Sequence, residues 1–358
     1  MGRERAPVRG AQGAHAPLLR LLILAGLVLA AASVVLGPRA VWRSLAGGPA
    51  IPAGEVLSLQ AAPFGDAIRA GELEQPALDE TSGLAASRRR PDLLWAVNDS
   101  GSPPRLYAVG IDGRDRGAVD LAGATNVDWE DLASFELDGR PHLLVADVGD
   151  NVARRASVTL YVLEEPPLEG DRFAGGSTAQ VAWTIEIVYE DGPLDCEAVA
   201  VDPVGERVLL ASKRTEPARL YEAPLRPSSG DAGRVTAVRV AEIPNVPRPT
   251  EADLEEDPRF GSFRSQITAL DVSADGRELV AVTYKDAYRF VRGGGETWGQ
   301  AVSGMPQLIP LPRMVQTEAG AYDRDGAALF VTTEQRPAPL FRLDRAVQGT
   351  TAVEDHAP

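Results

Sequence analysis

Residues 130–150, EDLASFELDGRPHLLVADVGD, decide the fold because their pattern returns along the chain. The stretch has a strand of small residues, a polar Asp-Gly turn and a second, aliphatic strand, which is typical of a β-hairpin. Further copies are SGLAASRRRPDLLWAVND (82–99), EAVAVDPVGERVLLASKR (197–214), TALDVSADGRELVAVTYKD (268–286) and EAGAYDRDGAALFVTTEQ (318–335). A hairpin repeated in this way predicts one repeat architecture rather than several unrelated domains.

Additional strands follow the repeated hairpins. Third strands are expected at 105–110, 158–165, 219–225, 287–291 and 339–345, and clear fourth strands at 181–189 and 235–243. Four antiparallel strands per unit, repeated around an axis, are the blades of an all-β β-propeller. Five blades can be counted, and the irregular spacing of the copies leaves six as the alternative. The last copy lacks an outer strand, and residues 55–60 (EVLSLQ) are expected to supply it and close the ring.

An apolar segment precedes the repeats. Leu21–Leu36 carries no charge, and the arginines on its N-terminal side predict a cytoplasmic N-terminus and an exported remainder. We expect a cytoplasmic Arg-rich tail (1–20), a transmembrane or signal-anchor helix (21–37), a linker (38–54), the propeller (55–345) and a disordered tail (346–358). The protein would then be a single-pass protein of the cytoplasmic membrane with an extracytoplasmic propeller. The alternative is secretion after cleavage near Ala30–Ala32.

The charge of the chain excludes one class of partner. The net charge is −15, and the first 43 residues hold six arginines against one glutamate, so the 30 basic and 50 acidic residues beyond them leave −20. This acidic remainder of the chain repels phosphate backbones, so we expect no nucleic-acid partner. With one cysteine, Cys196, and three histidines, a disulfide framework, a His-based zinc site and a Ser-His-Asp triad are not expected.

Polar residues recur at one end of the repeated hairpins. Aligning the first strands gives one column of Glu80, Asp128, Asp195, Gln266 and Gln316, and a second of Ser82, Glu130, Glu197, Thr268 and Glu318. The second strands end on the same rim of a propeller channel and are also polar there. Convergent polar groups at a concave opening predict a binding site. The candidate ligand-binding residues are Glu80, Asp99, Asp128, Glu130, Asp150, Asn151, Asp195, Glu197, Lys213, Arg214, Lys285 and Glu318. Alternatively, these side chains bond loop backbones and join blade to blade.

Several segments resemble a group of bacterial exported propeller proteins and, more distantly, the SdiA-regulated and the phytase-like or esterase-like propeller families. They are ETSGLAASRRRPDLLWAVNDSG, NVDWEDLA, LLVADVGDN, GPLDCEAVAVD and TYKDAY, within residues 78–344. Phytase-like and lactonase-like propellers hold calcium with carboxylates in the channel mouth. The resemblance thus implies a calcium site at Asp128, Glu130, Asp195 and Glu197, although Gln266 and Gln316 depart from an all-acidic ring.

Two functions follow from this pattern. The first is a membrane-anchored extracytoplasmic module that binds a small-molecule or protein ligand at an acidic channel mouth. The alternative is a calcium-dependent hydrolase of an ester, lactone or phosphoester, which would use the same carboxylates. No motif marks a nucleophile or a base, so no catalytic residue is assigned. Three or more oxygens converging on one point would favour the metal-dependent alternative.

Overall fold

The computed structural model describes residues 57–228 and 233–346. The expected segments 1–20, 21–37 and 38–54 and the tail beyond Ala346 lie outside the described residues. Within the described part the chain is all-β, which confirms the predicted class. Its helices are the short α3 (Glu251–Glu256), η1 (Gly261–Phe263) and α4 (Trp298–Ser303). None of the helices described is long and apolar enough to cross a membrane.

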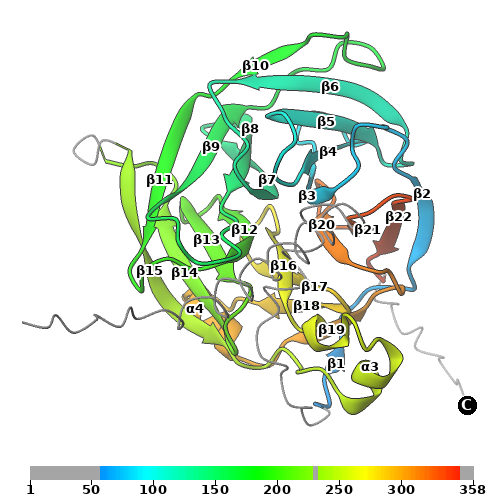
Figure 1. Cartoon of the computed structure of the whole chain (residues 1–358), viewed down its shortest axis with the longest axis vertical. Helices are drawn as coiled ribbons and strands as arrows, with labels where there is room; N and C mark the ends of the chain where they lie inside the picture. The colour runs from blue at the N-terminus through cyan, green and yellow to red at the C-terminus, as the bar shows by residue number, and fades with distance from the viewer. Residues whose placement is uncertain (1–56, 229–232, 347–358) are drawn as a thin grey trace, which may run out of the picture. The chain divides into compact units, whose positions relative to one another are not determined.

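The repeats fold into four-stranded antiparallel units, here called meanders 1 to 5 (Figure 1). Meander 1 is β3 (Thr81–Ala86), β4 (Leu93–Asn98), β5 (Arg105–Gly110) and β6 (Asp115–Ala122), extended at its outer edge by β10 (Thr178–Gln180). Meander 2 is β7 (Trp129–Leu137), β8 (Arg140–Asp147), β9 (Val158–Glu164) and β11 (Trp183–Tyr189). Meander 3 is β12 (Cys196–Asp202), β13 (Arg207–Ser212), β14 (Ala218–Pro224) and β15 (Arg234–Ile243). Parallel pairing of β11 with β15 makes meanders 2 and 3 one eight-stranded sheet.

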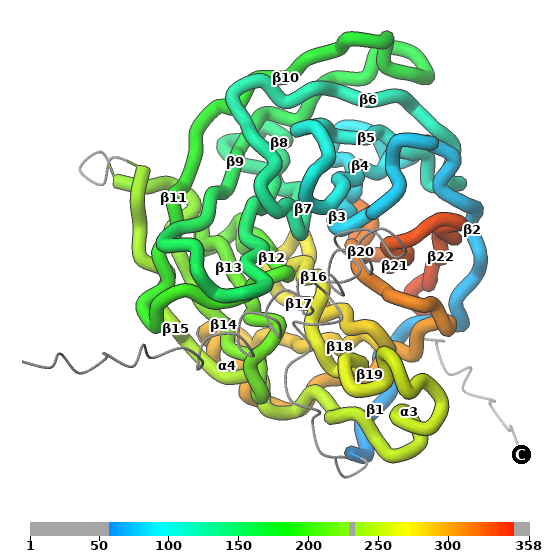
Figure 2. The backbone as a smooth tube through the Cα atoms, in the orientation of Figure 1, coloured from blue at the N-terminus to red at the C-terminus, as the bar shows by residue number. Residues whose placement is uncertain are grey.

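The remaining meanders contain the N-terminal strands of the described chain. Meander 4 is β16 (Ile267–Val272), β17 (Glu278–Thr283), β18 (Asp286–Val291) and β19 (Gln307–Pro310), with β1 (Gln60–Ala61) parallel to β19. Meander 5 is β20 (Thr317–Tyr322), β21 (Ala328–Thr333) and β22 (Pro339–Asp344), completed by β2 (Ile68–Glu72). Figure 2 shows β2 running beside β22 at the end of the ring.

The strand that completes meander 5 differs from the expected residues 55–60. Ile68–Glu72 fills that position. Within the described part of the expected segment, residues 57–60, only Gln60 is in a strand, and it pairs with β19. The fully buried Leu73 and Leu78, which follow β2, pack between meanders 5 and 1. This burial holds β2 in place, although the strand itself is an exposed edge with few apolar residues.

The core consists of apolar clusters between neighbouring meanders. One cluster contains Trp95 of meander 1 and Trp129 of meander 2, and corresponding clusters follow around the ring. Leu84 and Phe330 belong to the cluster that joins meander 5 to meander 1. The first strands β3, β7, β12, β16 and β20 lie next to one another in that order, and β20 lies next to β3 (Figure 1). These inner strands therefore surround the central axis of the ring, and the space around this axis is here called the channel.

Candidate functional site

A β-bulge recurs near the start of every inner strand of the five meanders. In β7 the register shifts between Trp129 and Asp131, so Glu130 is left without a residue opposite it on β8. The same shift leaves Ser82, Glu197, Thr268 and Glu318 without a residue opposite them in the register of the neighbouring strand. A bulge re-aims its extra side chain. Each of these five side chains is at most 4% exposed, so together they form a buried polar ring, here called the bulge ring.

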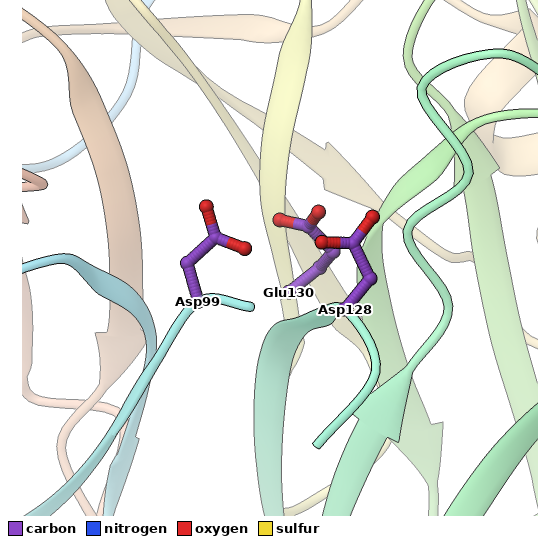
Figure 3. Close-up of side chains that lie close together, drawn as sticks. All are labelled: Asp99, Asp128 and Glu130. Carbon is purple, nitrogen blue, oxygen red and sulfur yellow. The ribbon is translucent and has the colours of Figure 1, made fainter. Parts of the chain in front are cut away.

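Two further carboxylates gather beside Glu130, a member of the bulge ring. Asp99 follows β4, Asp128 precedes β7, and Glu130 is the bulge residue of β7. One oxygen from each lies within 4.8 Å of the other two, and Figure 3 shows the three carboxylates gathered around one point. We call Asp99, Asp128 and Glu130 the acidic cluster.

Backbone contacts hold the acidic cluster in place. The side-chain amide of Asn126 donates to the carbonyls of Asn98 and Asp99, at 3.2 and 2.9 Å, and so ties the end of β4 to the loop before β7. The Asp147 carboxylate accepts the N–H groups of Val127 and Asp128, at 3.1 and 3.2 Å. Short polar side chains at strand ends commonly bond loop backbones in this way.

Gly149 leaves room for the carboxylates of the acidic cluster because it has no Cβ. A Cβ at Gly149 would lie 2.3 Å from Oε1 of Glu130 and 2.5 Å from Oδ2 of Asp128. The Gly149 N–H also donates to the Asp128 carbonyl at 3.1 Å, which keeps the two segments in contact. Any other residue at this position would displace the acidic cluster.

Burial and like charge act together on these groups. Burial raises the pKa of Asp128 to about 7, with further repulsion from Asp99 and Asp195. Burial also raises the pKa of Glu130 well above its ordinary value, followed by repulsion from Glu197 and Asp99, while Lys213 opposes the rise. Oε1 of Glu130 is buried and has no hydrogen-bond partner among the described residues. A buried acceptor without a partner is costly, and a bound cation would satisfy it.

The other predicted metal ligands lie in ion pairs. Nζ of Lys213 donates to Oε2 of Glu197, and both side chains are buried. Nε of Arg214 lies 2.5 Å from Oδ2 of Asp195, whose other oxygen accepts the Asp150 N–H at 3.0 Å. The predicted set of four carboxylates is thus divided. Asp128 and Glu130 join Asp99, whereas basic side chains compensate Asp195 and Glu197.

The remaining candidates lie around the same rim. The carbonyl of Glu80 accepts the Asp99 N–H at 3.0 Å, and Oδ2 of Asp150 accepts the Arg155 N–H at 2.6 Å. Asn151 accepts a hydrogen bond from Arg214, and Glu318 accepts one from Tyr284 at 2.9 Å. Lys285 pairs with Asp253 of α3 at 2.8 Å, so it holds the inserted helix.

Sequence reasoning missed Asp131, Gly149 and the isolated hydroxyl of Ser82. Asp131 follows Glu130 directly, and a regular strand would aim it away from the channel site. Oγ of Ser82 is buried without a hydrogen-bond partner among the described residues, like Oε1 of Glu130. The sequence signal for the bulge ring was the polar residue that recurs two positions after the first column. That spacing alone does not reveal a bulge.

The chain was compared with known proteins. No family model matches it, and no curated protein matches it, so the resemblance to the propeller families named above stays a prediction. Among solved structures, a gluconolactonase from Xanthomonas campestris has a TM-score of 0.43 at 15% identity and covers 83% of this chain and 97% of its own. The β-propeller domain of Swd1 from Myceliophteria thermophila has a TM-score of 0.36 at 10% identity, covering 75% of this chain and 84% of its own. A nidogen/laminin complex has a TM-score of 0.38 at 13% identity, covering 72% and 73%.

Proposed function

We propose that the protein is a five-bladed β-propeller that binds a calcium ion at its channel mouth and uses this ion to bind an oxygen-bearing ligand. Each meander would be one blade, with β2 completing the last. The ligands of the ion would be Asp99, Asp128 and Glu130. The observation that carries the proposal is the buried, unpartnered Oε1 of Glu130 within that cluster.

The donor set fits a hard cation. All three side chains offer oxygen, and calcium takes oxygen ligands at about 2.3–2.6 Å. Oxygens on opposite sides of such an ion are therefore about 4.8 Å apart. The ligand atoms of the acidic cluster lie within 4.8 Å of one another, so one ion can contact all three.

The acidic cluster differs from the neighbouring carboxylates in how its negative charge is compensated. Asp128 and Glu130 form no ion pair within the described part of the chain, whereas Glu197 and Asp195 pair with Lys213 and Arg214. Calcium takes six to eight ligands, so three carboxylates leave positions for water or for oxygen atoms of a ligand. A small-molecule or protein ligand with a carboxylate, phosphate or carbonyl group would complete the coordination.

Binding is favoured over hydrolysis. Lys213 lies in a buried pair with Glu197 and stacks 5.0 Å from the centre of the Tyr284 ring, so its ammonium already contacts protein groups. The alternative of a calcium-dependent hydrolase acting on an ester, lactone or phosphoester requires the ion to activate a water. Calcium-dependent turnover of 4-nitrophenyl acetate or of a simple lactone would establish that alternative.

A calorimetric calcium titration of the purified full chain tests the site. We expect one ion per chain. Glu130→Gln should weaken calcium binding at least about tenfold, because losing one charged contact costs more free energy than a tenfold change in affinity represents. Glu136→Gln is the matched control, since Glu136 is exposed on the same strand. Wild-type protein that binds no calcium at millimolar concentration, or equal affinities for Glu130→Gln and wild type, would refute the proposal.

We also propose that residues 21–37 anchor the chain in the cytoplasmic membrane and that residues 55–345 are extracytoplasmic. The arginine asymmetry around Leu21–Leu36 supports this topology. A reporter enzyme fused after Pro358 should be active only outside the cytoplasm. Cytoplasmic activity would contradict the topology, and release into the soluble exported fraction would instead indicate signal cleavage.

A further inference from the structure

The ends of the inner strands opposite the acidic cluster form a second rim, here called the second mouth. Along β7, Ser134 lies four residues beyond Glu130, which corresponds to about 13 Å of extended strand. A cavity of about 420 Å³ lies there, and its wall includes Arg88, Ser134, Val204, Val272 and Arg324. These residues come from the ends of the inner strands or the turns that follow them. The cavity is thus separate from the acidic cluster.

Arg88 is the buried cation of this cavity. It is 8% exposed, and its guanidinium is held by backbone and hydroxyl oxygens. Nε and Nη2 donate to Ser134, at 3.1 Å to both the hydroxyl and the carbonyl oxygen, and Nη1 donates to the Arg324 carbonyl at 2.8 Å. A guanidinium has five N–H groups. These bonds use one on each nitrogen, so Nη1 and Nη2 each retain one N–H for another acceptor.

Oε2 of Glu165 accepts the Arg88 backbone N–H at 2.9 Å, but no carboxylate of the described residues forms an ion pair with the Arg88 guanidinium. Asp271, further along the channel, uses both oxygens to accept the N–H groups of Val272 and Tyr322, each at 2.9 Å. Burial raises the pKa of Asp271 to about 6, and the positive charge of Arg88 is the largest of the effects that oppose this rise. Asp271 shares its charge with two backbone N–H groups and forms no hydrogen bond with Arg88, so an anion that accepts the two remaining N–H groups of the guanidinium would be stabilising.

The rim of the cavity restricts which anion fits. Val204 is 69% exposed and offers apolar surface at the opening. Glu136 and Asp325 line the same cavity and are exposed. Asp325 pairs with Arg324 at 3.3 Å, so Glu136 is the charge that repels ligands with several negative charges. We infer that this second mouth binds a singly charged organic carboxylate, with the carboxylate on Arg88 and an apolar body against Val204.

The probe is hexanoate, titrated calorimetrically into the purified full chain in the presence of EDTA. Saturable binding is expected, and hexanamide, which has the same shape without the charge, should bind at least about tenfold more weakly. Arg88→Lys should weaken hexanoate binding by a similar factor because it removes the planar fork of N–H groups. Arg114→Lys, at a highly exposed arginine, is the matched control and should bind hexanoate like wild type.

A second variant keeps the test valid should Arg88→Lys fail to fold. Val204→Trp enlarges an exposed side chain at the opening and should block hexanoate while leaving the melting temperature unchanged. Equal hexanoate affinity of Val204→Trp and wild type would overturn the inference, as would tighter binding of inorganic phosphate than of hexanoate. Glu130→Gln should bind hexanoate normally. Binding that requires calcium or Glu130 would instead place the anion at the acidic cluster.

Discussion

The Asp131 carboxylate ties three inner strands together from within the channel. Asp131 is fully buried, and its Oδ2 accepts the N–H groups of Val199 on β12 and Leu270 on β16, at 2.8 and 3.1 Å. Its Oδ1 accepts the N–H of Leu132 on β7 at 2.8 Å. Burial raises the pKa of Asp131, and the three N–H donors oppose this rise because they bond the charged form.

The change Asp131→Asn leaves only one acceptor oxygen for three donors. If that oxygen faces Val199 and Leu270, the new amide NH₂ points at the Leu132 N–H, so the Leu132 N–H loses its acceptor and the new NH₂ group is a second buried donor without one. Each buried donor without a partner costs about 1–3 kcal/mol, so we expect a loss of about 4 kcal/mol in the free energy of unfolding. This is a large fraction of the roughly 5–15 kcal/mol that stabilises a typical domain.

Urea unfolding followed by tryptophan fluorescence measures this loss, because Trp95, Trp129 and Trp298 are fully buried and report on the folded core. The melting temperature should fall by roughly 10 °C, since about 1 kcal/mol corresponds to about 2–4 °C in large domains. Asp66→Asn makes the same chemical change at an exposed position and should have little effect. A loss below about 1 kcal/mol in Asp131→Asn would refute this account of the carboxylate.

Three further measurements test other parts of the structure. Gly149→Ala should abolish the rise in melting temperature caused by calcium because its Cβ would meet Glu130, whereas Gly175→Ala, with no atom near the added carbon, should retain that rise. Although burial acts to raise the pKa of Glu278, Arg289 and Arg345 hold it at about 2, below its ordinary 4.5, so this ion pairing stabilises the fold above pH 4.5 and is lost as the pH falls toward 2. Urea titrations across this window should show a smaller acid-induced loss in Glu278→Gln than in wild type, and equal losses would contradict the pairing. Deletion of residues 1–73 removes β2 and exposes the edge of β22, so it should cause aggregation that deletion of residues 1–66 does not, as light scattering would show.

The fold could be predicted from the sequence where it depends on local pattern. The five aligned segments form the two inner strands of each meander, because small residues, turn chemistry and aliphatic strands are encoded within about 20 residues. The closing strand could not be found in this way. Ile68–Glu72 is an edge strand whose position depends on Leu73 and Leu78 packing between meanders distant in sequence.

The candidate site was predictable as a region but not as a set of partners. The repeat alignment placed Asp99, Asp128 and Glu130 on one rim, and the structure brings them together. The alignment could not show that Lys213 reaches Glu197 or that Arg214 reaches Asp195, because these contacts depend on where a bulge aims each side chain. Lys285 likewise pairs with Asp253, which belongs to an insertion outside the repeat.

The side chains of the bulge ring can change the chemistry of the channel without affecting the stability of the sheets. Each bulge residue lies outside the pairing register of its strand, so exchanging its side chain leaves the ladder hydrogen bonds intact. Substitutions at these positions can therefore accumulate one at a time during evolution without disturbing the pairing of the strands. Ser82, whose hydroxyl has no hydrogen-bond partner in the described structure, is the position at which a new ligand specificity would arise with the least disturbance.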